Sequence, residues 1–270
     1  MLWLRDVFGH DKAIIGMVHL PASPGSPRHA EEKGMTGILE SVEADIESYQ
    51  AGGVDAVMFC NEDDRPYQLR VGPEVVATMT RTVAAVRPKL KIPFGIDILW
   101  DPVAAIAIAH ATGASFVREV FTGAYAGDIG VWNTNCGEAL RFRRQIGAER
   151  VKLLYNINAE FAAPLAPREL SATAKSAVFS SLADGICVSG QMTGEDTGTA
   201  NLRAVKDVIP DVPVFANTGV HAESVAEKLA VADGAVVGTW FKQDGITWNP
   251  VDPERVRRFM TVVRGLRGQA

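Results

Sequence analysis

The sequence predicts a closed α/β barrel of eight parallel strands, the (β/α)8 or TIM-barrel class. Eight short β-rich segments recur about every 31 residues, which is the size of one βα unit. These segments are apolar on both faces, as expected for parallel strands that are covered on both sides. The length of 270 residues also fits one barrel of roughly 250 residues. A doubly wound open sheet, the competing fold, would need fewer strands or a second domain.

The eight predicted strands are residues 14–20, 54–61, 93–99, 114–120, 151–157, 184–189, 212–217 and 233–237. Helical patterns fill the segments between them; in 36–50, for example, Ile38, Val42 and Ile46 fall on one face. Pro102 and Pro253 each follow an aspartate, the pattern of an N-cap and a first helical turn.

We expect a single TIM-barrel domain over residues 1–270, since the composition shows no linker. Residues 1–12 are predicted to form an N-terminal cap, and residues 253–270 a C-terminal helix. Two long connections, 21–35 and 121–135, follow the first and fourth strands. Connections of this length are usually functional or disordered.

Composition excludes several classes of protein. Apolar residues make up 47%, charged residues 22%, and the net charge is −5, typical of a soluble globular chain. Mild acidity argues against nucleic acid as a partner, and the arginines of the C-terminal segment, such as Arg255, are interpreted as a solvated helix face. The three cysteines form no Cys-x-x-Cys pair, which indicates buried thiols in a reducing compartment. No signal peptide or integral membrane segment is found, so a cytoplasmic protein is expected.

The candidate catalytic residues lie where the strands end, because TIM barrels carry their active sites at the C-terminal ends of the strands. Asp97 shares a strand face with Gly95 and is expected to point into the barrel. It is a candidate general base or anchor for hydroxyls, or else the partner of Lys152 or Arg118 in an ion pair. Glu119 follows Arg118, and strand alternation allows only one of the two to face the mouth. His19 could move protons near neutral pH or could be a core histidine.

Phosphate binding is the activity best supported by the sequence. Barrels often hold phosphate with the loops after strands seven and eight. Here those loops contain glycines and hydroxyls that can approach an anion, or glycines that simply suit tight turns. The candidate binding residues are Asn217, Gly219, Gly238 and Thr239, with Ser189 and Gly190 as a third edge and Asn156 and Glu62 at neighbouring strand ends.

Cofactors are not determined by these patterns. No histidine-rich metal motif occurs, although an oxygen-rich Mg²⁺ site from Glu62, Asp97 and Glu119 stays open. FMN is the less favoured occupant of the phosphate loops. Lys152 is expected at the entry end of strand five, and Lys242 beyond strand eight could close over a ligand but is poorly placed as a nucleophile.

Several motifs in combination resemble the BtpA family. They are GMVHLP at 16–21 with PGSP at 24–27, VSG at 188–190 with TG at 193–194, ANTGV at 216–220, ADG at 232–234, and VGT at 237–239 with Lys242, DG at 244–245 and NPVD at 249–252. The stretch FVREVFTGA at 116–124 is most similar to the SgcQ branch. The resemblance covers almost the whole chain and implies a ribulose-phosphate-binding type of barrel.

The resemblance implies no single reaction. Its SgcQ branch points to carbohydrate metabolism, whereas the family name points to photosystem I accumulation. This chain departs from the photosynthetic-type pattern at 61–67 and 97–100, both at the barrel mouth, so a different ligand is expected. Two hypotheses follow: an isomerase, epimerase or lyase acting on a small phosphorylated metabolite, or a non-catalytic assembly or regulatory factor. A homo-oligomer is compatible with either.

Overall fold

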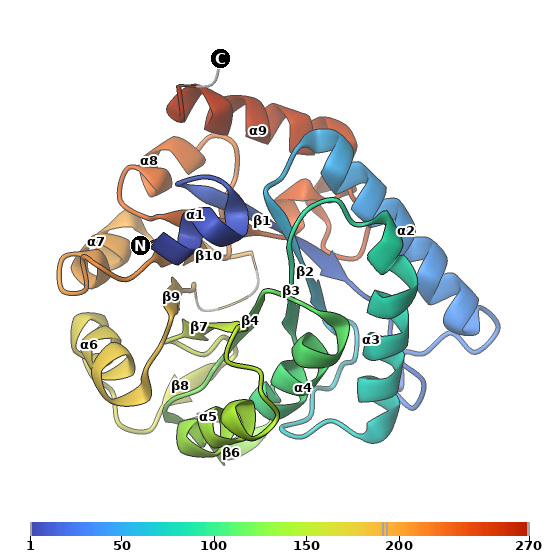
Figure 1. The fold of residues 1–270 in the computed structure, drawn as a ribbon, viewed down its shortest axis with the longest axis horizontal. Helices are drawn as coiled ribbons and strands as arrows, with labels where there is room; N and C mark the ends of the chain where they lie inside the picture. The colour runs from blue at the N-terminus through green and yellow to red at the C-terminus, as the bar shows by residue number, and fades with distance from the viewer. Residues whose placement is uncertain (1, 191, 193, 269–270) are drawn as a thin grey trace.

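The computed structural model describes residues 2–190, 192 and 194–268 and contains a closed barrel of eight parallel strands (Figure 1). The order around the barrel is β1-β11-β10-β9-β7-β4-β3-β2. The predicted fold class is therefore confirmed, and each barrel strand overlaps one predicted segment. The strands are β1 (Ala13–His19), β2 (Ala56–Cys60), β3 (Phe94–Asp97), β4 (Phe116–Glu119), β7 (Lys152–Asn156), β9 (Gly185–Val188), β10 (Val214–Asn217) and β11 (Gly234–Val237).

Helices surround the barrel and cover its outer face (Figure 1). They are α2 (Gly34–Gly52), α3 (Pro73–Val86), α4 (Pro102–Thr112), α5 (Cys136–Gln145), α6 (Leu170–Ser181), α7 (Thr199–Lys206), α8 (Val225–Leu229) and α9 (Pro253–Leu266), with 3-10 turns η1 (Arg87–Lys89), η2 (Thr239–Phe241) and η3 (Gln243–Gly245). The predicted N-caps are confirmed: the Asp101 carboxylate accepts hydrogen bonds from two N–H groups of α4, and Asp252 does the same for α9. No described helix is long and apolar enough to cross a membrane.

The N-terminal end of the barrel is closed by α1 (Leu2–Phe8), which is drawn beside β1 and β10 in Figure 1. The ring of Phe8 packs edge-on against Phe116 and Phe215 inside the barrel, with ring centroids 5.4 and 6.1 Å apart. Leu4 is also buried there. Because this end is filled by apolar side chains, a polar site has to be sought at the C-terminal ends of the strands.

A second, antiparallel sheet was not predicted. It consists of β5 (Ala124–Gly127), β6 (Gly130–Asn133) and β8 (Ala162–Pro164), in the order β6-β5-β8. The segment 121–135 is therefore a hairpin, and the connection after β7 supplies its third strand. The sheet carries Trp132, which stacks on Tyr125 with ring centroids 4.6 Å apart and lies 5.8 Å from Trp100 at the end of β3. Aromatic side chains thus gather at one side of the barrel mouth.

Candidate functional site

The mouth of the barrel is organised around Arg118 on β4. Its guanidinium is buried and donates a hydrogen bond to the Asn217 side-chain oxygen at 3.1 Å, and it lies 3.6 Å from carboxylate oxygens of both Asp97 and Glu160. The pairing of Ile96 with Val117 brings the next residues of β3 and β4, Asp97 and Arg118, together at the strand ends. Asp97 therefore takes the predicted position, and of the two ion pairs considered for it the structure forms the one with Arg118.

Asp97 and Glu119 are two buried carboxyl groups at the ends of neighbouring strands, β3 and β4. Burial and the nearby Asp97 charge raise the pKa of Glu119 well above its usual value. Burial also raises the pKa of Asp97, against the opposing effect of the Arg118 charge. The charged form of Glu119 is therefore disfavoured. Of Arg118 and Glu119, only Arg118 is among the described residues that line the cavity at the mouth, as expected from the alternation along the strand.

Glu62, just beyond the end of β2, is the carboxyl group that titrates near neutral pH. Its side chain is buried, and burial raises its pKa from 4.5 to about 7, with Glu160 and Asp97 adding to the shift and Arg118 opposing it. A group with this pKa can both accept and release a proton at physiological pH. The sequence assigned Glu62 to binding; the electrostatics make it the strongest candidate for proton transfer.

His19, the last residue of β1, lines the same cavity. Burial, with the positive charges of Lys242 and Arg118, lowers its pKa to about 3, and a hydrogen bond with the Thr247 backbone opposes the shift only in part. The imidazole is therefore uncharged at neutral pH. Of the two interpretations of His19, a group that moves protons near neutral pH and a core histidine, the lowered pKa favours the second, because burial and cations both disfavour the charged form.

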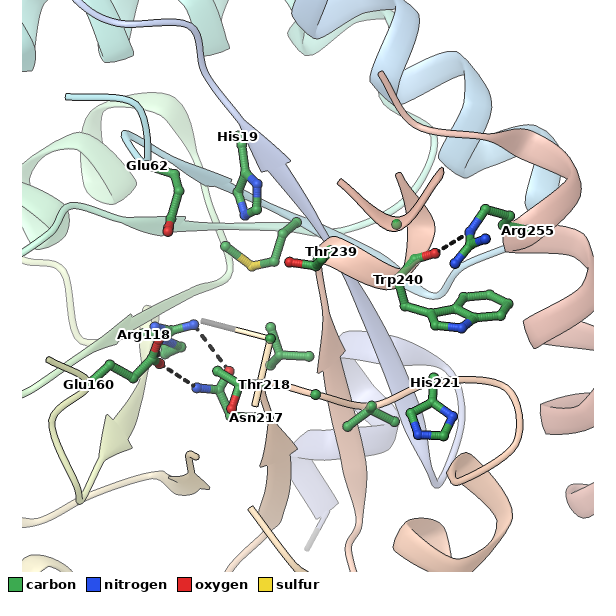
Figure 2. Close-up of a pocket in the computed structure, with 17 residues that line it drawn as sticks. His19, Glu62, Arg118, Glu160, Asn217, Thr218, His221, Thr239, Trp240 and Arg255 are labelled. Carbon is green, nitrogen blue, oxygen red and sulfur yellow. Dashed lines mark hydrogen bonds and ion pairs between the residues drawn. The ribbon is translucent and has the colours of Figure 1, made fainter. Parts of the chain in front are cut away.

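The loops after β10 and β11 form the other wall of this cavity, which has a volume of about 170 Å³ (Figure 2). Thr218 and Gly219 both adopt left-handed backbone conformations, with φ of 61° and 64°. A Cβ on Gly219 would lie 2.4 Å from the backbone nitrogen of Asp196, so the close approach of the two loops requires glycine here. The predicted phosphate-binding residues Asn217, Gly219, Gly238 and Thr239 all line the cavity.

Arg255 of α9 supplies a cation to this cavity that the sequence analysis missed. Its Nε donates a hydrogen bond to the Trp240 carbonyl at 2.6 Å, and its guanidinium lies 4.6 Å from the centre of the Trp240 ring. Figure 2 shows Arg255 and His221 at one end of the cavity and Glu62 and Glu160 at the other. The interpretation of Arg255 as part of a solvated face is therefore wrong; only the return of α9 to the mouth in three dimensions reveals its position.

Ser189 and Gly190 do not line this cavity. The Gly190 N–H donates to the Thr218 hydroxyl at 2.8 Å. The Ser189 hydroxyl donates to Asn156 Oδ1 at 2.5 Å and accepts from Asn217 Nδ2 at 2.6 Å. The expected third edge of a phosphate site is thus not formed, because the Gly190 N–H and the Ser189 hydroxyl are already hydrogen-bonded to neighbouring side chains. Asn156 and Ser189 instead hold the Asn217 amide, which in turn orients the guanidinium of Arg118.

Lys242 is also held away from the cavity. Its ammonium is buried and pairs with Asp45 of α2 at 2.6 Å, and the same carboxylate accepts the Val251 N–H at 2.8 Å. The suggestion that Lys242 closes over a ligand is therefore wrong; it fastens the β11 loop to α2. Lys152 begins β7, as predicted, and pairs with Asp184.

Among the described residues, no group of three or more His, Cys, Asp or Glu side chains has an arrangement that could hold a metal ion. The Mg²⁺ site that the sequence left open at Glu62, Asp97 and Glu119 is thus not formed by these three carboxyl groups. Of the three, Asp97 lies 3.6 Å from the Arg118 guanidinium and forms an ion pair with it instead.

Fold and site together define the class: a TIM barrel with a cationic end and an acidic end in one cavity at its mouth. The chain belongs to the BtpA family, whose model matches residues 10–265. It is 48% identical to the sgc region protein SgcQ of Escherichia coli (strain K12) over 99% of this chain and 100% of that one. It is 32% identical to the photosystem I biogenesis protein BtpA of Synechocystis sp. (strain ATCC 27184 / PCC 6803 / Kazusa), over 98% and 93% of the two chains.

Solved structures with similar folds include enzymes. One is an archaeal fructose 1,6-bisphosphate aldolase, with a TM-score of 0.58 and 16% identity over 97% of this chain and 98% of that one. Another is the phosphoribosyl anthranilate isomerase from Thermus thermophilus, with a TM-score of 0.56 and 12% identity over 94% and 100% of the two chains. At these identities the likeness establishes the shared barrel fold alone.

Proposed function

We propose that this protein is an enzyme that acts on a phosphorylated sugar or a related phosphate metabolite by proton transfer. The observation that carries the proposal is the placement of Glu62, with a pKa of about 7, in the same cavity as the glycine-containing loops after β10 and β11. An acid–base group and a potential anion site therefore share one small cavity.

The phosphate would bind at the end of the cavity that carries Arg255. Backbone N–H groups around Gly219 and Gly238, the Thr239 hydroxyl and the guanidinium are the types of donor that phosphate oxygens accept. Negative charge is disfavoured at the opposite end by Glu62 and Glu160. The charge distribution therefore orients the metabolite with its phosphate toward α9 and its reacting atoms toward β2.

Proton transfer would be carried out by Glu62. Isomerisation, epimerisation and aldol-type cleavage each require a proton to be removed from or returned to carbon or oxygen near a carbonyl group. In this arrangement Arg118 stabilises the buried negative charge of Asp97 and Glu160. The uncharged imidazole of His19 contributes a hydrogen bond rather than a charge.

Thermal unfolding with a panel of pentose and hexose phosphates, FMN and Mg²⁺ tests the proposal. A ligand present at about 100 times its dissociation constant stabilises the fold by roughly 2.7 kcal/mol, which is a clear shift in Tm. The shift should be lost in Thr239→Arg, which fills the cavity. It should persist in Thr261→Arg, the matched control at an exposed position of α9.

The alternative is a non-catalytic assembly or regulatory factor, as the name of the Synechocystis relative suggests for that protein. No response to any phosphate in the panel, with Glu62→Gln indistinguishable from wild type in all ligand assays, would refute the enzyme and favour this alternative.

A further inference from the structure

A second cavity adjoins the first and is walled by aromatic side chains. Its volume is about 420 Å³, against about 170 Å³ for the first. Its aromatic lining consists of Tyr67, Trp100, Trp132, Phe161 and Trp248. Glu62 and Glu160 line both cavities. The acidic end of the first cavity is therefore the junction between a cationic chamber and an aromatic one.

Three of the five rings, those of Tyr67, Trp100 and Trp132, are held by packing against their neighbours, and the Arg65 guanidinium lies over the Trp248 ring, 3.6 Å from its centre. Trp100 and Trp132 are both buried, and Trp132 is stacked against Tyr125 of the small sheet. Tyr67 meets the Trp100 ring edge-on with centroids 6.3 Å apart, and its hydroxyl donates to the Glu62 carbonyl at 3.1 Å. Rings held in this way provide a binding surface without losing side-chain entropy when a ligand binds.

Two polar atoms of residues that line this cavity, the Trp132 indole nitrogen and Arg65 Nε, have no hydrogen-bond partner among the described residues. Trp132 is 6% exposed, and its indole N–H is buried with no hydrogen-bond partner among the described residues. An unpaired buried donor is costly unless a ligand or water satisfies it. Together with the acceptor oxygens of Glu62 and Glu160, it gives an apolar cavity a few polar groups, which is the usual composition of a small-molecule site.

We propose that the aromatic cavity is the subsite for an uncharged ring that is part of the substrate and carries hydrogen-bond donors and acceptors on its edge. The ring would stack on the aromatic walls, and its donors would face the carboxyl oxygens at the junction. Both a glycosyl ring and a nucleobase have this chemistry. The inference rests on the proposed function for the phosphate end, and it narrows the substrate to a ring-bearing phosphate that spans both cavities.

The volumes support a substrate of this size. At about 30 Å³ per water molecule, the aromatic cavity has room for about 14 water molecules, whereas the first has room for about five or six. A phosphate group and a short carbon chain would fill the first cavity and leave the second empty. Only a metabolite large enough to fill both cavities would place the bonds that join its ring to its phosphate next to Glu62, at the junction.

Calorimetric titration tests the inference with three probes: inorganic phosphate, a hexose 1-phosphate and a nucleoside 5′-monophosphate. The wild type should bind at least one ring-bearing probe about 10-fold or more tighter than inorganic phosphate, because the ring stacks on the aromatic walls. The preferred ring identifies the source of the ligand.

Two variants address the aromatic walls. Trp248→Ala removes a partly exposed ring, and Trp132→Phe keeps an aromatic ring while removing the N–H donor. Each should reduce the advantage of the ring-bearing probe by about 5- to 10-fold and leave the affinity for inorganic phosphate unchanged. Phe179→Ala, at a position of α6 that is 89% exposed, is the control and should change neither.

The outcomes separate this inference from the proposed function. If inorganic phosphate binds and no ring increases the affinity, the aromatic subsite is refuted and the phosphate site stands. If an uncharged methyl glycoside or nucleoside binds in a manner lost in Trp248→Ala while no phosphate compound binds more tightly, the subsite is supported and the phosphate site is refuted. A ring advantage that Trp248→Ala and Trp132→Phe both leave intact also overturns the inference.

Discussion

Replacing Glu62 by glutamine should make the protein's stability less sensitive to alkaline pH. In the folded protein the pKa of Glu62 is raised from 4.5 to about 7, so the folded state holds a proton that the unfolded chain has already released. Below the unfolded value both states are protonated and the group contributes nothing. As the pH rises through this range its contribution becomes unfavourable, and above the folded value the cost is complete.

The size of this effect follows from the pKa difference. At about 1.36 kcal/mol per pH unit, the rise from 4.5 to about 7 corresponds to a cost of about 3 kcal/mol at high pH. Between about pH 5.5 and about pH 8.5, roughly 2 kcal/mol of that cost develops. Glutamine keeps the size of the side chain and removes the titration, so the variant should gain about this much relative to the wild type over the interval.

Urea unfolding at the two pH values gives the free energies needed. The informative quantity is the difference between Glu62→Gln and wild type, because the neighbouring carboxyl groups are present in both proteins. Glu40→Gln, at an exposed position of α2, serves as the matched control. A difference between Glu62→Gln and wild type that is the same at both pH values would refute the assignment of Glu62 as the group that titrates near neutral pH.

Three further substitutions test the packing of the site. Arg118→Met removes the cation between two buried carboxylates and should destabilise the fold by about 3–5 kcal/mol in urea; a loss below about 1 kcal/mol would contradict the network. Gly219→Ala forces a Cβ to 2.4 Å from a backbone nitrogen at positive φ, so it should cost about 1–3 kcal/mol and weaken phosphate binding, and an unchanged Tm would argue against this loop geometry. Lys242→Met leaves the buried Asp45 without its cation and should lower the free energy of unfolding by about 3–5 kcal/mol. Arg257→Met, at an exposed ion pair, should lower it by at most about 1 kcal/mol; equal losses would show that burial is not decisive.

The barrel could be predicted because its signal is local and repeated. Each strand is a short apolar segment followed by a helical pattern, and N-cap aspartates such as Asp101 mark helix starts in the sequence itself. The rule that TIM-barrel sites lie at the C-terminal ends of strands then selected Asp97, Glu119, His19 and Glu62 as candidates, and of these His19 and Glu62 line the cavity at the mouth. Their positions follow from topology, which the repeat determines.

The chemistry of these residues could not be predicted in the same way. Whether His19 is charged depends on the burial and on the cations of Arg118 and Lys242, which come from other strands and loops. The arrival of Arg255 at the cavity depends on how α9 packs against α2 and the β11 loop. These segments are far apart in the sequence: the Lys242–Asp45 pair, which fastens the β11 loop to α2, has a separation of 197 residues. Long-range packing of this kind leaves no local pattern.

The aromatic cavity was missed for a related reason. Its walls come from the β2 and β3 ends, from the small antiparallel sheet and from the segment after β11. The strands of that sheet are only three or four residues long, and β8 pairs with β5 across more than 30 residues. The sequence marked 121–135 as a long connection, which was the one available signal of unusual structure there.

The central claim is that a phosphorylated metabolite binds in the cavity between the β10 and β11 loops with its reacting part beside Glu62. The most direct measurement is a crystal structure of the complex with the phosphate ester that raises Tm most. The account predicts the phosphorus within hydrogen-bonding reach of the Gly219 and Thr239 loops and of Arg255, with the remainder of the ligand extending toward Glu62 and the aromatic cavity. A phosphate bound anywhere else on the barrel, or bound here with the ligand directed away from Glu62 into solvent, would contradict it.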